Sequence, residues 1–569
     1  MKWDFIDDYD ENQLGYDLSD LTMDQFFLDI NLNSSHLEEI YLYTLNEDCY
    51  KCPFLLSHHG NHTNTGLVTK DPPHNIFKTN TKFRIASEYK EYFPQEQTDN
   101  VICDFSSNFD QFGIYKVDVN ESGCYMNILK EPVNIYSPIL TVILLYVALY
   151  LLVYCIFRLW RKCIPKVVEP DKKAPKKRVQ SLDTFRGLTI VTMIFANFGC
   201  GGYGIIEHAK WNGLHLADLV FPSFVWIMGV CIPISLSSSF KRNVPNKTLI
   251  FNITKRSIKL FCLGIFLNSG ADLNYLRLFG VLQRFSIAYF VVSIVCIYSM
   301  DRSQEQPEQG IFADIMRIWK GWVVVISLLL THTAVIFTVA APKCPRGYMG
   351  PGGLHENLSH KNCIGGATGY IDGLILGNHR YQNPTIYSVY EAKPFDPEGI
   401  VGCLTTIFHT FIGVQAGTTL LVYKSHSQRL LRWFMWAVVT GVIGGCLCGF
   451  RKEDGLIPVN KNLWSSSFVM VTSCFAFFLL SICYVLIDVK NWWSGKPFLF
   501  AGMNAILMYI GHEMTDGHFP VRWYLHNNSA ITTDPRRTHF IALLSDLWGV
   551  GIWVFISFYL HEKGVFFTI

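Results

Sequence analysis

The chain carries a series of long apolar segments, and these constrain its fold more than any other feature. Residues 138–160 (PILTVILLYVALYLLVYCIFRLW) contain one charged residue, close to their end, and are long enough to span about 30 Å of hydrocarbon. Only 17% of the 569 residues are charged, whereas soluble globular proteins carry roughly 25%. These two observations predict a membrane protein and exclude a disordered or collagen-like chain.

Ten further apolar segments follow the first one. They cover residues 187–206, 214–236, 257–267, 276–300, 319–341, 400–423, 430–450, 463–487, 498–512 and 541–560. The predicted fold is therefore an α-helical polytopic membrane protein with about eleven transmembrane helices, of which about ten belong to a domain at residues 181–569. Alternation from a first span that enters the cytosol leaves three basic loops inside, at residues 241–247, 424–432 and 490–496.

Charge sets the direction of these spans. Residues 161–178 contain eight Lys and Arg residues and two acidic ones, and a basic run beside a span normally marks the cytosolic side. A nucleic-acid partner is disfavoured because this run lies directly against the first span. Residues 1–137 hold 23 acidic and nine basic residues, a net charge of −14, whereas the rest of the chain is +16. We therefore expect a lumenal or extracellular domain at 1–137, a cytosolic linker at 161–180 and a cytosolic C-terminus.

Six cysteines fall in the segments expected to face oxidising space. They are Cys49, Cys52, Cys103, Cys124, Cys344 and Cys363. An even number in this setting predicts disulfides, although the sequence leaves their connectivity open. Cys49 and Cys52 resemble half of a zinc site, but no second pair completes it, so we expect no metal.

The N-terminal domain is expected to be small, β-rich and tied by these disulfides, because residues 112–119 alternate in part between apolar and polar side chains. Residues 1–20 are acidic and lack the apolar core of a signal peptide. Possible glycan acceptors in Asn-X-Ser/Thr sequences are Asn33, Asn61, Asn120 and Asn357.

Polar groups inside membrane spans are costly and usually face a cavity or a substrate path. Asp183 and Arg186 lie at the cytosolic start of the second span, three residues apart, so they share a helical face and can pair. They could equally be an anchor at the membrane surface. Arg284 lies about two turns into the fifth span, where its guanidinium needs a carbonyl, carboxylate or phosphate partner.

A denser polar group follows the second span on its outer side. Glycines at 199, 201 and 202 allow close approach of the backbone to a ligand. The polar residues around them are Asn197, His208, Asn212, His215 and Asp218. A histidine with an asparagine and an aspartate nearby suits acid–base or nucleophilic chemistry, although a single interfacial histidine is usually structural. No P-loop, GxSxG or HExxH sequence is present.

The motifs around these residues resemble one known family. They include QSLDTFRGLTIVTMIFANFGCGGYG, HAKWNGLHLADLVFPSFVWIMG, GVLQRFSIAYFVV, FDPEGIVGCLTTIFHTFIGVQAG, VNKNLWSSSFV and AGMNAILMYIGHE. Together they cover most of residues 181–513, and their order is specific. The chain resembles the heparan-α-glucosaminide N-acetyltransferases, a family of lysosomal membrane enzymes.

The resemblance implies a transfer of acetyl from cytosolic acetyl-CoA to the terminal non-reducing glucosamine of heparan sulfate in the lysosomal lumen. It implies that His208 is catalytic, with Asn197 as an active-site neighbour. Arg186 and Asp183 would lie where CoA arrives, and Arg284 would hold the pantetheine arm or the geometry of the site. It also implies a homodimer and a lysosomal address, for which no sorting signal is legible in the sequence.

Two alternatives stay open from the sequence. A transporter or carrier could keep this scaffold without acyl transfer, and an acetyltransferase could act on a different amino sugar. The catalytic histidine could carry the acetyl group covalently or remove a proton from the amine, and we favour the general base. Because the acceptor is a polyanion, we expect Lys210, Lys343 and Arg346 to meet its sulfate or carboxylate groups.

Overall fold

A computed structural model gives the fold of two compact units. It describes residues 12–13, 16–18, 21–32, 39–61, 76–106, 109–120, 123–163, 179–268, 272–300, 310–515 and 538–567. The first unit comprises Met1–Arg178, Phe198–Tyr203 and Pro520–Gly549, and the second comprises Val179–Asn197, Gly204–Phe519 and Val550–Ile569. Most of the predicted basic linker, residues 164–178, lies outside the described residues.

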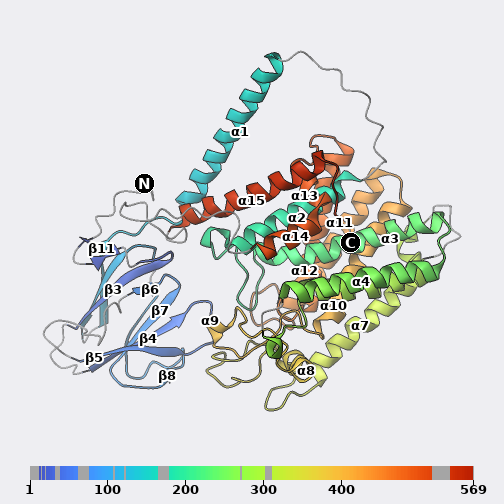
Figure 1. Cartoon of the computed structure of the whole chain (residues 1–569). Helices are drawn as coiled ribbons and strands as arrows, with labels where there is room; N and C mark the ends of the chain where they lie inside the picture. The colour runs from blue at the N-terminus through green and yellow to red at the C-terminus, as the bar shows by residue number, and fades with distance from the viewer. Residues whose placement is uncertain are drawn as a thin grey trace. The chain divides into compact units, whose positions relative to one another are not determined.

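The first unit contains two facing β-sheets and one long helix, α1 (Figure 1). One sheet has the order β11-β10-β3-β6 and the other the order β8-β5-β4-β7-β9, while β1 and β2 form a separate pair. The strands are β1 Asn12–Gln13, β2 Tyr16–Asp17, β3 Gln25–Leu32, β4 Glu39–Asn46, β5 Phe54–Asn61, β6 Ile76–Lys78, β7 Thr81–Ala86, β8 Tyr92–Phe93, β9 Val101–Phe105, β10 Ile114–Asn120 and β11 Gly123–Lys130.

Alternation along the strands explains the core of this β domain. Phe26, Leu28 and Ile30 of β3 are buried, as the two-residue period of a strand requires. The ring of Phe26 stacks on that of Phe109, with centroids 4.4 Å apart, and Phe83 and Tyr115 complete an aromatic centre. The prediction of a small β-rich N-terminal domain is confirmed.

All six cysteines expected to face oxidising space form disulfides. Cys49 pairs with Cys52, Cys103 with Cys124, and Cys344 with Cys363. The second bridge links β9 of one sheet to β11 of the other, so it ties the sandwich together. Cys49 and Cys52 bond to each other, which rules out the half zinc site at this pair.

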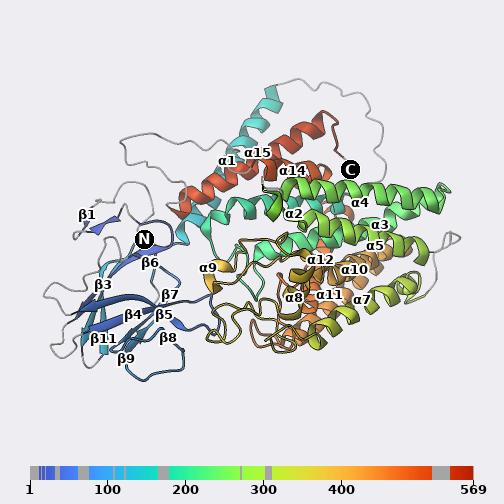
Figure 2. The ribbon, with the colours of Figure 1, turned by 60° about the horizontal axis from the view of Figure 1, so that its bottom comes forward.

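The second unit is a bundle of helices. In it, α3, α4, α5 and α7 run alongside one another, and the segments around α8 and α9 gather at one end of the bundle (Figure 2). The longer helices of the chain are α1 Ser137–Cys163, α2 Gln180–Phe198, α3 Val220–Lys241, α4 Asn246–Asn268, α5 Val281–Ser299, α7 Trp319–Thr338, α10 Gly402–Val422, α11 His426–Cys448, α12 Ser466–Tyr484 and α15 His539–Glu562. Shorter ones are η2 Cys200–Gly202, η3 Leu216–Leu219, η4 Leu273–Tyr275, α6 Ala313–Met316, α8 Gly366–Leu376, α9 Tyr387–Tyr390, η5 Val485–Val489, α13 Phe498–Met503 and α14 Ala505–Met514.

Each of the eleven predicted apolar segments overlaps helix, although residues 203–206 and 276–280 of two of them are not helical, and the prediction of a polytopic helical membrane protein is confirmed. Seven helices within the described ranges are long and apolar enough to cross a membrane, so the number eleven stays a prediction. The segment at 498–512 is two helices, α13 and α14, which meet at Asn504. Helix α10 is not among these seven because His409, Gln415 and several threonines make it less apolar, and all of these residues are buried against neighbouring helices.

Glycines allow α10 to pack closely on α3. A Cβ on Gly413 would lie 2.0 Å from the carbonyl oxygen of Trp226, and one on Gly229 would lie 1.9 Å from that of Thr410. Neither oxygen can move without displacing its helix. Small residues at helix contacts are the usual means of close packing in membranes, so this contact fixes the centre of the bundle.

Replacing Gly413 by alanine should lower the thermal midpoint of the detergent-solubilised protein by several degrees, because overpacking costs roughly 1–3 kcal/mol. Gly551→Ala in α15 is the matched control, since nothing lies within 4 Å of its added Cβ, and it should keep or raise the midpoint. Equal midpoints for the two variants would contradict this account of the contact.

Candidate active site

The site is built around Asp218, a buried carboxylate in the 3₁₀ turn η3, directly before α3. Its Oδ2 accepts hydrogen bonds from the backbone N–H groups of Ala209 (3.0 Å) and His215 (3.1 Å). Its Oδ1 lies 2.8 Å from Nδ1 of His208. Asp218 is 1% exposed, so these bonds replace the water that an ionised carboxylate would otherwise need. The segment from 208 to 218 is therefore folded around one carboxylate.

His208 is held in one orientation but remains accessible. Its side chain is 42% exposed, and we assign the ring proton to Nδ1 because the carboxylate of Asp218 can only accept. The Nε2 atom then carries the lone pair. An aspartate that fixes the tautomer of a histidine in this way is the arrangement found in enzymes that use the other ring nitrogen as a base or nucleophile.

Lys461 brings a positive charge to the same ring. Its Nζ lies 2.9 Å from Nδ1 and 3.3 Å from Nε2 of His208, and 3.5 Å from Oδ1 of Asp218. Burial lowers the pKa of Lys461, although the nearby carboxylates of Asp218 and Glu398 act in the opposite direction. In its ammonium form, which the two carboxylates favour, Lys461 can donate to a group that gains negative charge beside His208.

Backbone pairing sets the position of Lys461. Asn212 and Asn460 form an isolated β-bridge, and Nδ2 of Asn460 donates to Oδ1 of Asn212 at 3.0 Å. The N–H of Gly213 also donates to the carbonyl of Val459 at 2.9 Å. Two loops far apart in sequence are thus joined one residue before Lys461.

A pocket of about 100 Å³ opens beside these groups. Its lining includes His208, Lys461 and Asn462, and also Tyr381, Phe395 and Glu398. Arg277 holds Glu398 through a 2.5 Å contact to Oε2 and binds both carboxylate oxygens of Asp396. Burial alone would raise the pKa of Glu398, but three nearby cations, Arg277 first and then Arg284 and Lys461, outweigh it and lower that pKa below its usual range. The pocket therefore combines a histidine, an ammonium and a carboxylate that stays ionised in acid.

Comparison with known proteins identifies the family. A family model described as heparan-alpha-glucosaminide N-acetyltransferase, catalytic, matches residues 178–306. The mouse (Mus musculus) protein named heparan-alpha-glucosaminide N-acetyltransferase is 32% identical over 605 residues, covering 97% of this chain and 89% of the mouse protein. The human (Homo sapiens) protein of the same name is 39% identical over 408 residues, covering 69% of this chain and 60% of the human protein.

The chain belongs to the heparan-α-glucosaminide N-acetyltransferase family. Membership confirms the resemblance found in the sequence and places the chain among the N-acetyltransferases. The matched region at 178–306 contains His208 and Asp218 but ends well before Glu398 and Lys461. The pocket is thus assembled partly from residues inside the matched region and partly from residues far beyond it.

Asn197, predicted as a neighbour of His208, has other partners in this family member. Its Nδ2 donates to Nε2 of His512 at 2.8 Å and to Oε1 of Glu513 at 3.0 Å. Nδ1 of His512 donates in turn to the carbonyl of Met508. In the described part of the chain no hydrogen bond joins Asn197 to His208, so the two form separate groups.

Asp183 and Arg186 pair as their spacing predicted. Nη1 of Arg186 lies 3.4 Å from Oδ1 of Asp183 and donates to the carbonyl of Gly502 at 3.3 Å. Both residues lie near the first turn of α2, whereas Asn197 lies near its last. A helix rises 1.5 Å per residue, so about 20 Å of helix separates the pair from Asn197.

Arg284 lies in the interior, behind the segment that carries Glu398. It is 1% exposed, its Nη2 donates to the carbonyl of Gly399 at 2.9 Å, and its guanidinium lies over the ring of Trp464. Gly402 leaves room for it, since an added Cβ there would lie 2.5 Å from Nη2. Arg277 and Arg284 therefore hold the 396–399 segment from two sides.

The sequence prediction missed two residues of the pocket, Glu398 and Lys461, and it also missed Arg277, which holds Glu398 from outside the lining. Glu398 and Lys461 stand in the motifs FDPEGIVG and VNKNLWSSSFV, which supplied the resemblance but were not interpreted as chemistry. Of the cations expected to meet the acceptor, Lys210 instead pairs with Glu207 at 3.7 Å. Lys343 and Arg346 are exposed and do not line this pocket. Among the residues described, no group of three or more His, Cys, Asp or Glu side chains is arranged to hold a metal ion.

Replacing Arg277 by methionine should move the acidic limb of the kcat/KM profile to higher pH. Without the guanidinium, only Arg284 and Lys461 still oppose burial, so the pKa of Glu398 rises and its carboxylate takes up a proton at a higher pH than in the wild type. Arg277→Lys keeps a positive charge and should shift the limb less. An unmoved acidic limb in an Arg277→Met protein of normal thermal midpoint would mean that the charge of Glu398 is irrelevant to the reaction.

Proposed function

We propose that the protein transfers acetyl from acetyl-CoA, bound from the cytosol, to the terminal non-reducing glucosamine of heparan sulfate in the lysosomal lumen. The observation that carries this proposal is the accessible His208, oriented by Asp218 and flanked by Lys461 at a pocket that also contains Glu398. Family membership supports the reaction, because the mouse and human relatives are named for it.

The chemistry requires a deprotonated amine beside an activated carbonyl. The amine nitrogen attacks the carbonyl carbon of the thioester, and the bond from that carbon to sulfur breaks. The CoA thiolate leaves and takes up a proton to become the thiol. In the proposed route, Nε2 of His208 takes the proton that the amine loses and Asp218 stabilises the imidazolium. Lys461 donates to the carbonyl oxygen as negative charge develops on it.

Glu398 suits recognition of the acceptor. Glucosamine arrives largely as an ammonium in an acidic lumen, and a carboxylate that stays ionised there can bind it. Arg277 supports this role because it keeps the pKa of Glu398 low. We therefore assign Glu398 to the acceptor amine and His208 to its deprotonation.

The donor end of the proposal uses the other sequence-derived residues. Arg186, paired with Asp183, is proposed to contact a phosphate of CoA near the first turn of α2. Arg284 is proposed to keep the site in shape through Gly399, and its Nε and Nη1 have no partner among the described residues, so they can meet a carbonyl of the pantetheine arm. The basic run at 161–178 supports a cytosolic linker, with the N-terminal domain and the pocket on the lumenal side.

His208→Ala should abolish transfer from labelled acetyl-CoA to a glucosaminide, because it removes the base. Incubation of the wild type with labelled acetyl-CoA and no acceptor should leave His208 unlabelled if it acts as a base; an acetylated His208 would replace that route with a covalent one. Full activity of His208→Ala would overturn both.

A wild type that transports the sugar without acetylating it would instead be a carrier, and acetylation of other amino sugars alone would change the acceptor.

Asp218→Asn should lower kcat by roughly 100-fold or more, because an amide can present its NH₂ to Nδ1 and favour the wrong ring tautomer. The acceptor KM should change little, since Asp218 is buried away from the pocket. Lys210→Gln alters another polar residue of the same loop, one whose side chain pairs with Glu207, and should keep kcat near the wild-type value. A kcat for Asp218→Asn within a few-fold of the wild type would remove Asp218 from the mechanism.

A further inference from the structure

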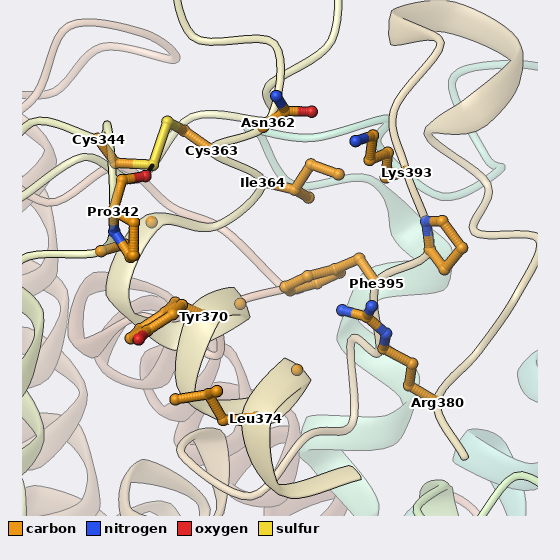
Figure 3. A pocket seen from close by; sticks show the side chains of 15 residues that line it. Pro342, Cys344, Asn362, Cys363, Ile364, Tyr370, Leu374, Arg380, Lys393 and Phe395 are labelled. Atoms are coloured by element: carbon orange, nitrogen blue, oxygen red, sulfur yellow. Dashed lines mark hydrogen bonds between the residues drawn. A yellow bond between two sulfur atoms is a disulfide. The ribbon is translucent and has the colours of Figure 1, made fainter. Parts of the chain in front are cut away.

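A second cavity adjoins the pocket of His208. Its volume is about 290 Å³, close to the lower end of the range for small-molecule sites, about 300 Å³. Helix α8, the Cys344–Cys363 bridge and the residues around Phe395 line it. Figure 3 shows the disulfide and Tyr370 on one side of the space, and Lys393, Phe395 and Arg380 on the other.

The lining of this cavity is positively charged. Among the described residues that line it are Arg380 and Lys393, and none of these residues is acidic. Neither cation forms an ion pair within the ranges that the structure describes, in contrast to Arg277 and Lys210, which both have carboxylate partners. The two charges are therefore available to a ligand, and the ligand they favour is an anion.

The shape of the cavity suits a sugar ring. Gly366, Gly369 and Gly373 lie on one face of α8 and line the space without side chains. A Cβ on Gly373 would lie 2.9 Å from Nη1 of Arg380, so the glycine leaves room for the guanidinium. The rings of Tyr370 and Phe395 add flat apolar surface against which the C–H faces of a sugar can pack.

Phe395 connects the two cavities. Its side chain lines both this space and the pocket that contains His208, Lys461 and Glu398. A glycan whose terminal residue lies at His208 could thus extend its next residue past Phe395 toward Arg380 and Lys393. In heparan sulfate that next residue is a uronic acid, which carries a carboxylate and often a sulfate.

We propose that this cavity is a subsite for the anionic sugar that follows the terminal glucosamine, with Arg380 and Lys393 binding its carboxylate or sulfate. The proposal rests on the proposed function, because it takes the acceptor amine to lie at His208. It assigns selection for an acidic glycan to two residues that have no part in the chemistry of acyl transfer.

The test compares two acceptors on the full-length enzyme in detergent. One is a glucosaminide with an uncharged aglycone, and the other is a disaccharide of glucosamine linked to a uronic acid. The ratio of their kcat/KM values should fall about tenfold or more in Arg380→Gln, since hydrogen bonds to charged groups are worth that much. It should fall about threefold in Lys393→Gln, because Lys393 is more exposed and its charge is more strongly screened.

Lys361→Gln is the matched control, because Lys361 is exposed in the same loop but does not line the cavity, and it should leave the ratio unchanged. An unchanged ratio in Arg380→Gln and Lys393→Gln overturns the subsite, while wild-type acetylation of both acceptors keeps the proposed function intact. If the wild type acetylates neither acceptor, the proposed function fails and the subsite fails with it. A lipid headgroup is the other anion that the cavity could bind. If Arg380→Gln and Lys393→Gln leave the ratio unchanged but alter the effect of phosphatidylserine vesicles on the rate with the neutral acceptor, the cavity binds lipid headgroups and the proposal is wrong.

Discussion

The hydrogen bonds to Asp218 are the interaction on which the site depends. A carboxylate that is 1% exposed is tolerable only when donors replace its lost water, and here two backbone N–H groups, His208 and Lys461 do so. The same bonds fix the loop, the ring tautomer and the ammonium. A change at Asp218 therefore acts on structure and chemistry together, because removing one partner would leave the others unsatisfied in a buried place.

The fold was readable from the sequence wherever one local property decides it. Apolar length marks a helix that can lie in lipid, and each predicted apolar segment does overlap helix. The β domain and its disulfides followed from alternation and from an even number of cysteines in one compartment. Helix α10 shows the limit of this reasoning. Its threonines, His409 and Gln415 lower its hydropathy because they are buried against other helices, and that information lies in packing.

Only part of the site could be predicted from the sequence, because the rest depends on packing between distant segments. His208 and Asp218 are ten residues apart, so their association could be expected from one loop. Lys461 is 253 residues from His208, and it reaches the ring through the bridge between Asn212 and Asn460. Glu398 depends on Arg277, which is 121 residues away. Neither pairing has a periodic or local signal. Asn197 was grouped with His208 by proximity in sequence, whereas the end of α2 directs it to His512 and Glu513.

The net charge of a domain does not decide whether the protein can bind an anionic acceptor, because the charges close to the binding site decide it. The N-terminal 137 residues have a net charge of −14, which would be expected to repel a polyanionic glycan. At physiological ionic strength, however, exposed charges are largely screened beyond about 8 Å. The groups within that distance of a bound sugar then decide whether it is held. In the cavity beside α8 those groups are Arg380 and Lys393, and none of the described residues that line it is acidic. An acidic domain and the proposed cationic glycan site are therefore compatible in one chain, because exposed charges act only over a short range.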